Sequence, residues 1–539
     1  MKKKSLKKNL LYFALAFTLA GAMLLSGCGS ETSENEKNGA TEDSPSAVCS
    51  NGVMIGQIEN GVTSYLGVPY AEQPVGELRW KAPVAAADSD EEIVCDEYGN
   101  TALQYEWPTE QASYSEKGED CLTLNIWSSG DAENKPVMFW IHGGGYSWGG
   151  TTDPIYDGQK FAEANPDVIL VTANYRLGVM AWADFSQVPG GEEYTDLNLG
   201  IRDHICALEW VQKNIEAFGG DPDNVTIFGE SAGGASVNTL TASPAARGLF
   251  QKAIIESGSN DPADSVQDAR DFADLMMETA GCENMEEMLE VTAEEWMELD
   301  TEYWLGDESP GPVVDGVIVP EDYEAGLKEA AASGVKLLIG YNGDEDYYFV
   351  QEYEGKNKKK QWRENHLKEW EETYASLPDE GKALMDEYMQ IQTDQGKKKV
   401  FAISEFTTDA EGYWATTWAN AFSEGGGDVY MYYWDVPSTS NKYYKGACHA
   451  VELAYVFNNL QDTIYTGENP DEETAVKTQE AWTNFAKTGN PSISDVEWTT
   501  YNENTKETMM ITLDGWSMES DPMSRQREIY RTLMDNYLR

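Results

Sequence analysis

The sequence predicts an α/β protein whose core is a large, mostly parallel β-sheet with helices on both faces. Short apolar runs rich in β-branched and aromatic residues alternate with longer segments of helical spacing, which is typical of parallel sheets covered on both sides. At 539 residues and 41% hydrophobic, the chain is also long enough to bury one large core. The predicted strands are PVMFWI (136–141), VILVTA (168–173), VTIF (225–228), AIIE (253–256), KLLIG (336–340) and VYMYYW (429–434).

A single domain is expected over residues 48–539. No repeat divides this region, and no linker rich in proline, glycine or serine does. The clearest helical pattern is RDHICALEWVQKNIEAF (202–218), which lies between two predicted strands. Residues 262–330 and 350–425 are mainly helical in pattern and acidic, and we interpret them as insertions that form a cap or side wall.

The charge of the chain argues against one class of partner. Lys and Arg together number 38 and Asp and Glu number 94, which gives a formal net charge of −56. Such a surface repels phosphates, so we expect no nucleic acid partner. The 17 Trp and 29 Tyr suit a large multilayered enzyme better than a disordered scaffold.

The first 27 residues predict a secretory signal. A basic start, MKKKSLKK, precedes the apolar run 10–25, which is shorter than the roughly 20 residues of a membrane-spanning helix. LSGC (25–28) resembles a bacterial lipoprotein box, which implies cleavage before Cys28 and a lipid on its thiol. Residues 28–47 are polar and predict a flexible tether. The alternatives are a plain signal peptide or an anchor helix. We therefore expect a mature protein attached through Cys28 to the extracellular face of the bacterial membrane.

The chain has seven cysteines, and six thiols remain if Cys28 carries a lipid. An exported protein permits disulfides. No C-x-x-C spacing occurs and the chain has four histidines, so we expect neither a metal site nor an organic cofactor.

FGESAGGAS (228–236) is the strongest local signal. An apolar β-branched run precedes it and a small-residue helical segment follows, so Ser231 stands at a strand–turn–helix apex. This is the pattern of the nucleophile elbow G-x-S-x-G of α/β-hydrolases, whose glycines permit a strained turn and close backbone approach. A chance match of a short motif is the alternative, and the partners of the serine must decide.

Elimination among the four histidines predicts the base. In α/β-hydrolases the nucleophile, the acid and the histidine follow in that order. His142 and His204 precede Ser231, and His366 lies among charged residues at helical spacing, typical of a surface position. His449 lies in GACHAVELAYVF, a small-residue loop that leads into an apolar helix. We interpret His449 as the base; the alternative is a core histidine.

The third catalytic residue, an acid, and the donors of an oxyanion hole are expected in segments that directly follow predicted strands. LLIGYNGDEDYYF offers Asp344, Glu345 and Asp346 in succession, and position alone does not choose among them. WIHGGGYSWGG (140–150) also follows a strand, and its glycines expose backbone N–H groups as an oxyanion hole requires. Phosphate binding is the alternative, but no lysine follows in a Walker pattern.

The chain resembles the type-B carboxylesterase family from about residue 50 to 539. The resemblance lies in GVTSYLGVPYAEQPVGELRWKAP, EDCLTLNIW, NYRLG, FGGDPDNVTIFGESAGG, PVVDG, GYNGDED, GACHAVELAYVF and WTNFAKTGNP, in this order. It implies an α/β-hydrolase fold with Ser231 as nucleophile, Glu345 as acid and His449 as base. It further implies oxyanion-hole amides at Gly144, Gly145 and Ala232, a supporting carboxylate at Glu230 and a disulfide between Cys95 and Cys121.

The chain departs from the family pattern at three places. Asp346 stands where the motif G-x-N-x-D-E-G has its last glycine, and Ala450 replaces a usual glycine after the histidine. No cysteine follows Cys282 within thirty residues, so the second family disulfide is not expected.

The resemblance implies a serine hydrolase that cleaves carboxylic esters of small molecules through an acyl-enzyme, without a cofactor. The alternatives are a non-catalytic adhesion protein of the cholinesterase-like branch, or a lipase for longer acyl chains. Trp107 is the only tryptophan between Cys95 and Cys121, and its alignment does not support a choline site, so no choline ester is predicted.

Overall fold

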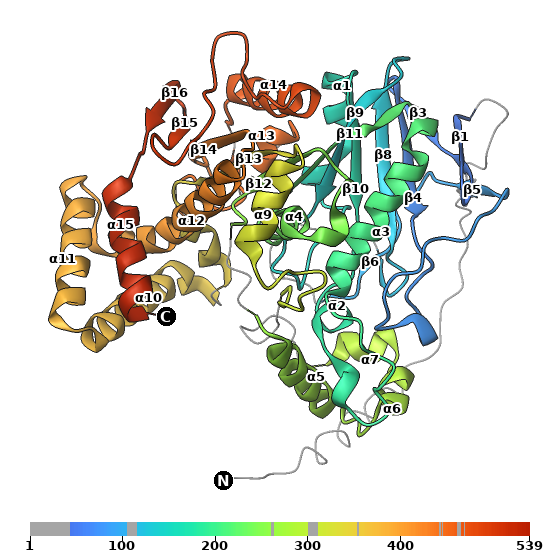
Figure 1. Ribbon diagram of the computed structural model, residues 1–539, viewed down its shortest axis with the longest axis horizontal. Coiled ribbons are helices and arrows are strands. Elements are labelled where there is room, and N and C mark those ends of the chain that lie inside the picture. Colours follow the sequence, from blue (N-terminus) through green and yellow to red (C-terminus); the bar gives the residue numbers. More distant parts are fainter. Residues whose placement is uncertain are drawn as a thin grey trace, which may run out of the picture. The chain divides into compact units, whose positions relative to one another are not determined.

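A central sheet organises the computed structural model, which describes residues 44–104, 116–259, 264–299, 311–352, 355–440, 444, 446–460, 465–467 and 469–538. In this part of the chain the sheet has eleven strands (Figure 1). Neighbouring strands from β10 to β15 are parallel, and antiparallel strands complete both edges. The spatial order is β16 (Gly515–Ser520), β15 (Glu507–Thr512), β14 (Val429–Asp435), β13 (Lys336–Asn342), β12 (Lys252–Glu256), β11 (Gly220–Glu230), β9 (Lys135–Ile141), β10 (Ile169–Ala173), β8 (Thr123–Ser129), β4 (Val62–Pro69) and β3 (Gln57–Glu59). The predicted mostly parallel sheet is confirmed.

Alternation along the strands creates two cores, one on each face. In β9, Val137, Phe139 and Ile141 belong to one core, whereas Met138 and Trp140 belong to the other. This period of two is what a sheet buried on both faces requires. The first core is covered by α3 (Leu199–Asn214), α4 (Ala232–Ala242), α9 (Tyr323–Ala332) and part of α12 (Lys399–Glu424), and the second by α1 (Gly158–Ala164), α13 (Leu453–Val456) and α14 (Glu472–Thr488).

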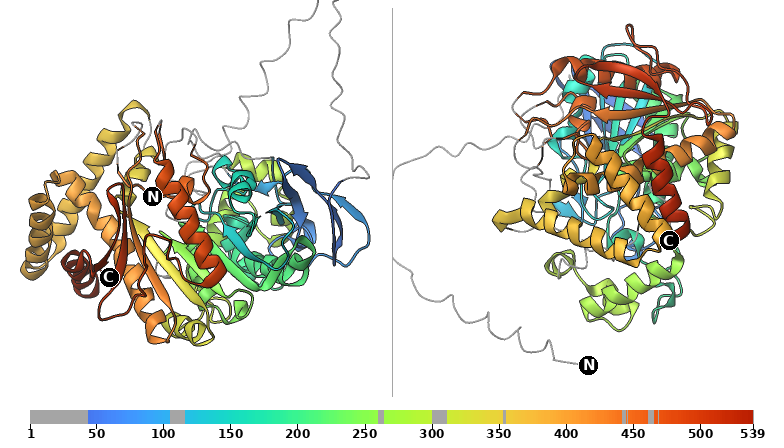
Figure 2. Two further views of the ribbon diagram at one scale, coloured as in Figure 1. Left: turned by 90° about the horizontal axis from the view of Figure 1, so that it is seen from above. Right: turned by 90° about the vertical axis from the view of Figure 1, so that its left-hand side faces the viewer.

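Two helical groups with their own small cores stand beside the sheet (Figures 1 and 2). The first contains α2 (Val179–Trp182), α5 (Val266–Ala280), α6 (Met285–Glu290) and α7 (Ala293–Glu298). The second joins α10 (Lys358–Ser376), α11 (Asp379–Asp394) and α15 (Ser524–Leu533) to α12. Both insertions were predicted as helical, but α9 and half of α12 pack on the sheet itself.

The smaller strands lie outside the central sheet. One small sheet contains β1 (Ser46–Cys49), β2 (Gly52–Ile55) and β5 (Glu92–Val94), and a two-stranded pair contains β6 (Thr101–Ala102) and β7 (Lys117–Gly118). Among the described residues, no helix combines the length and the apolar character needed to cross a membrane. Cys28, Trp107 and the apolar run 10–25 lie outside the described residues.

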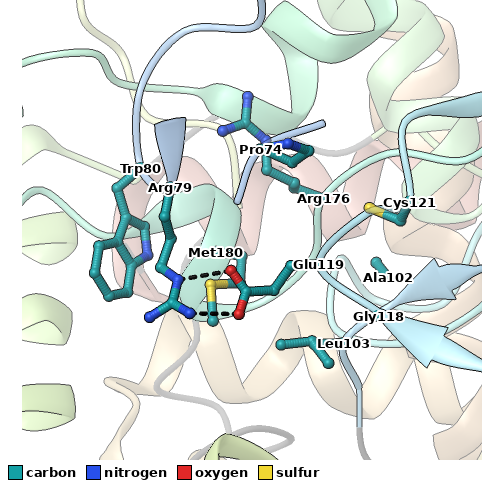
Figure 3. A pocket seen from close by; sticks show the side chains of 10 residues that line it. All are labelled: Pro74, Arg79, Trp80, Ala102, Leu103, Gly118, Glu119, Cys121, Arg176 and Met180. Atoms are coloured by element: carbon teal, nitrogen blue, oxygen red, sulfur yellow. Dashed lines mark hydrogen bonds and ion pairs between the residues drawn. The ribbon is translucent and has the colours of Figure 1, made fainter. Parts of the chain in front are cut away.

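The disulfide expected between Cys95 and Cys121 is wrong: both residues are free, buried thiols. The Cys95 thiol lies 3.8 Å from the Met54 sulfur, at the end of the small sheet. Cys121 instead lines a small cavity together with Arg176 and the ion pair of Arg79 and Glu119 (Figure 3). The two thiols therefore contact different residues, although the resemblance pairs them.

Candidate active site

Ser231 occupies a strained turn between β11 and α4. Its backbone has φ 56° and ψ −127°, and its side chain is half-buried. The two motif glycines are required by close packing. A Cβ on Gly229 would lie 2.6 Å from the backbone carbon of Gly233, and a Cβ on Gly233 would lie 2.1 Å from the carbonyl oxygen of Ile141. The G-x-S-x-G pattern therefore follows from sterics, and the turn presents the hydroxyl at the end of the sheet.

The glycine-rich loop after β9 lies against this turn. A Cβ on Gly143 would lie 3.0 Å from the Cβ of Ser231. Gly144 and Gly145 have φ 112° and 56°, which favour glycine. The amides of Gly144, Gly145 and Ala232 donate no hydrogen bond to any of the described residues. Three backbone donors thus remain available beside the serine.

His449 and Glu345 form a tight buried pair. The Nδ1 atom of His449 lies 2.6 Å from Oε2 of Glu345, and the two side chains are 10% and 3% exposed. Glu345 begins the short helix η7 (Glu345–Glu352) after β13, and His449 follows β14. Because β11, β13 and β14 are parallel, their carboxyl ends meet at one edge of the sheet, which is where Ser231 also lies.

Three further residues hold Glu345, two at its carboxylate and one at its backbone amide, and the sequence analysis missed all three. The Ser257 hydroxyl and the Asn342 amide each donate to Oε1, both at 2.7 Å. The Glu345 amide donates to the Thr408 hydroxyl at 3.1 Å. Ser257 directly follows a predicted strand, β12, and this position is the signal that could have found it.

The structure separates the three consecutive acids that position alone left open. Asp344 accepts from the Ala447 amide at 3.1 Å and so ties down the loop that carries His449. Asp346 contacts Nε2 of His366 at 2.7 Å. Of the three, only Glu345 contacts His449. The expectation that His366 lies on the surface is wrong, because its side chain is 12% exposed, packs on the Trp362 ring of its own helix, α10, and pairs with Asp346 of η7.

The Nε2 atom of His449 faces Glu230, the last residue of β11. It lies 3.0 Å from the Oε1 atom of Glu230. Ser231 makes no side-chain hydrogen bond with a described residue, so the serine–histidine bond is not formed in this structure. Catalytic hydrogen bonds often tighten only when substrate binds. Burial lowers the pKa of His449, but Glu230 and Glu345 act more strongly in the opposite direction, so the net shift is upward.

A group of buried glutamates surrounds this pair. Burial raises the pKa of Glu230 to about 8, and that of Glu411 and Glu452 to about 7. Burial also raises the pKa of Glu256, whose carboxylate accepts from the Trp482 indole at 2.8 Å. These shifts have one cause, which is the cost of several ionised carboxylates in one desolvated volume. Burial and the neighbouring carboxylates thus both disfavour the ionised forms of these glutamates.

The structure also places Ala450 and the two histidines that precede Ser231 in the chain. Ala450, which follows the histidine, has φ 65°, so the usual glycine there reflects a left-handed backbone that this chain imposes on alanine. His142 and His204 are buried on either side of Tyr175. Burial lowers their pKa values to about 4 and about 3, so both are neutral.

Comparison with known proteins identifies the family of this chain. The Carboxylesterase family profile matches residues 43–529. The para-nitrobenzyl esterase of Bacillus subtilis (strain 168) is 36% identical over 497 residues, covering 88% of this chain and 96% of that protein. The liver carboxylesterase of Sus scrofa is 33% identical over 475 residues, covering 80% and 82%. Among solved structures, the Geobacillus stearothermophilus carboxylesterase EST55 has a TM-score of 0.78 and 32% identity, covering 90% of this chain and 99% of that chain.

The family match, the shared sheet and the identity above 30% over most of each chain lead to one assignment. The fold is the α/β-hydrolase fold, as predicted. The chain belongs to the carboxylesterase family and is a carboxylic ester hydrolase of the serine type.

Proposed function

We propose that the protein cleaves carboxylic esters with Ser231 as nucleophile, His449 as general base and Glu345 as the acid that orients the imidazole. The observation that carries this proposal is the 2.6 Å contact between His449 and Glu345. A carboxylate held by two donors keeps the imidazole in one tautomer and stabilises its charge when it takes a proton.

The reaction follows from these positions. The Ser231 oxygen attacks the carbonyl carbon and its proton passes to Nε2 of His449, while the carbonyl electrons move to the oxygen. The amides of Gly144, Gly145 and Ala232 stabilise that oxyanion, each contributing about 3–4 kcal/mol. The carbon–oxygen bond to the alcohol then breaks, and His449 returns the proton to the leaving oxygen. Water repeats the sequence on the acyl-enzyme and releases the acid.

Glu230 controls whether Nε2 can accept that proton. An ionised Glu230 holds a proton on the imidazole, whereas a neutral carboxyl leaves Nε2 available. Burial raises the pKa of Glu230 to about 8, with Glu452 and Glu345 nearby adding to the shift. The two groups titrate together, because ionising Glu230 favours protonation of His449. The base form of His449 is therefore the form in which the proton shared by the pair lies on Glu230.

The decisive experiment replaces the serine. Ser231→Ala should fold normally and lose several orders of magnitude in ester turnover, because no nucleophile remains. A fluorophosphonate should label Ser231 in the native enzyme and nothing in the variant, as read by peptide mass spectrometry. Activity that survives the substitution, or labelling elsewhere, contradicts the proposal.

The presence of Ser231, Glu345, His449 and the glycine-rich loop argues against the adhesion alternative, whose members typically lack the serine. The substrate is best sought with nitrophenyl esters of increasing acyl length, run beside acetylated and feruloylated sugars. Activity that peaks at short chains would exclude the lipase alternative.

We also propose that the enzyme is exported as a lipoprotein anchored through Cys28. LSGC (25–28) and the polar tether behind it support this attachment. Removal of the five lysines in residues 1–27 takes the formal charge from −56 to −61, and the tether lets such a chain stand away from an anionic membrane. Mass spectrometry of the membrane fraction should find an N-terminus at modified Cys28, and Cys28→Ser should release the protein. A soluble native form that begins elsewhere would contradict this.

A further inference from the structure

His366 and Asp346 form a second buried histidine–carboxylate pair that the reaction does not use directly. Nε2 of His366 lies 2.7 Å from Oδ2 of Asp346, and the side chains are 12% and 8% exposed. Nδ1 of His366 lies 2.9 Å from the carbonyl oxygen of Trp362, one helical turn earlier. A carbonyl only accepts hydrogen bonds, and imidazole is a far stronger base than a carboxylate, so both ring nitrogens donate. This geometry requires the charged imidazolium.

The pair lies directly behind the acid. Asp346 is the residue after Glu345 in η7, and its carboxylate also accepts from the Ser404 hydroxyl at 2.9 Å. Ser404 and Thr408 are four residues apart in α12, so they lie on the same face of that helix. The first holds Asp346 and the second holds the Glu345 amide. Three elements, α10, η7 and α12, thus meet at these two acids.

The other charged groups near His366 do not replace Asp346. On α10, Glu369 adds a favourable charge one turn away, while Arg363 lies over the rings of Phe401 and Tyr444. On α12, Glu405 is paired with Lys397 at 2.5 Å. Asp346 is the one carboxylate of η7 in contact with the imidazole among the described residues.

We propose that His366 and Asp346 are positioning residues, which hold η7 in the orientation that brings the Glu345 carboxylate onto His449. This inference rests on the proposed triad and extends it. Among the described residues His449 is the one cation that pairs with Glu345. Besides the ion pair of Asp346, neutral hydrogen bonds hold this end of η7, from three hydroxyls (Ser257, Ser404 and Thr408) and from the backbone of the loop that carries His449. The ionic bond at the next residue fixes the angle of the helix.

The pair makes positioning dependent on pH. Burial lowers the pKa of His366, but the hydrogen bond and charge of Asp346 more than offset this and raise it above its usual value. A raised folded-state pKa gives stabilisation that is complete below the unfolded value, about 6.5, and is lost as pH rises through the folded value. The pair therefore holds η7 most firmly at weakly acidic pH.

The test compares kcat of wild type with His366→Gln and Asp346→Asn from pH 6 to 9. Glutamine keeps one donor without charge, as neutral histidine does, and asparagine keeps an acceptor for Ser404. At pH 6 we expect kcat to fall about tenfold in each variant with KM within about twofold, because the acid is displaced rather than removed. The ratio of wild-type to His366→Gln kcat should approach one at high pH, and the rate of fluorophosphonate labelling of Ser231 should fall in parallel.

Arg525→Gln is the matched control, because it breaks an ion pair between α15 and Glu387 of α11 away from η7. It should leave the pH profile unchanged. Thermal melts at each assay pH establish folding, and Asp346→Asn carries the test if His366→Gln does not fold. A kcat ratio near one at pH 6, or a ratio constant from pH 6 to 9, would overturn the positioning role. Neither result would touch the proposed triad, which Ser231→Ala and Glu345→Gln test separately.

Discussion

Consecutive residues of η7 carry two histidine–carboxylate pairs of nearly equal length. Glu345 meets His449 at 2.6 Å, and Asp346 meets His366 at 2.7 Å. Both pairs are buried, and in both the carboxylate is also held by a serine hydroxyl, from Ser257 and Ser404 respectively. Distance and burial alone therefore do not distinguish the pair that we place in the chemistry from the pair that supports it.

The second nitrogen of each histidine makes the difference. In His366 this nitrogen faces the Trp362 carbonyl oxygen, which accepts a hydrogen bond and does not titrate. In His449 it faces Glu230, a carboxyl whose pKa burial raises to about 8 and which directly precedes Ser231. The His366 imidazole stays charged up to its raised pKa, whereas the His449 imidazole faces a carboxyl with which it can exchange a proton. A histidine can act as a general base when one ring nitrogen is unprotonated and lies within reach of the proton that it takes.

Removing the carboxylate charge should affect the two pairs very differently, and the largest loss of activity is expected at Glu345. Glu345→Gln should lower kcat by about 10³- to 10⁴-fold, because the imidazolium loses its partner and its tautomer is no longer held. Asp346→Asn and Asp344→Asn serve as matched controls, and both should have much smaller effects. Steady-state kinetics with a nitrophenyl ester measures all three. If Asp346→Asn were the most damaging, the acid would be assigned one residue too early.

Glu230→Gln tests the difference between the two histidines by changing the group that faces Nε2 of His449. The negative charge of Glu230 raises the pKa of His449, so its removal lowers that pKa and makes the base available at lower pH. The acidic limb of the kcat/KM profile should therefore move down by about one pH unit. Glu256→Gln is the control, because Glu256 contacts Trp482 instead of the histidine. A limb that stays in place or moves upward would contradict the role given to Glu230.

The smallest expected effect concerns the loop that carries His449. Ala450→Gly should stabilise the fold by about 0.5–1 kcal/mol, because φ 65° strains alanine and not glycine. Thermal melting at fixed pH measures it. Ala447→Gly, in the same loop but without a positive φ, should destabilise instead. If both substitutions lowered the melting temperature, strain at Ala450 would not limit stability.

The strands and the nucleophile elbow could be predicted because each depends on residues that are close together in the sequence. A strand buried on both faces needs a continuous apolar run, and PVMFWI, AIIE and VYMYYW match β9, β12 and β14 within one residue at each end. The turn at Ser231 needs glycines at fixed offsets, because a Cβ at Gly229 or Gly233 would meet the backbone. Chain order and residue chemistry predicted His449 among four histidines, and the structure places it against Glu345, although the surface position expected for His366 was wrong.

Local patterns in the sequence thus predict the parallel sheet, the strand–turn–helix at Ser231 and the chain order of Ser231, the acidic run and His449. Position leaves three adjacent acids open and the family resemblance implies Glu345, whereas the packing of η7 against α12 and β12 brings that carboxylate onto His449. The fold also buries His366, because the packing of α10, a helix of polar sequence, brings this side chain onto Asp346, which lies twenty residues earlier in the chain. The Cys95–Cys121 disulfide failed for the same reason. Sequence spacing encodes local geometry, whereas the direction in which a side chain points depends on elements that are distant in the chain and meet only in the fold.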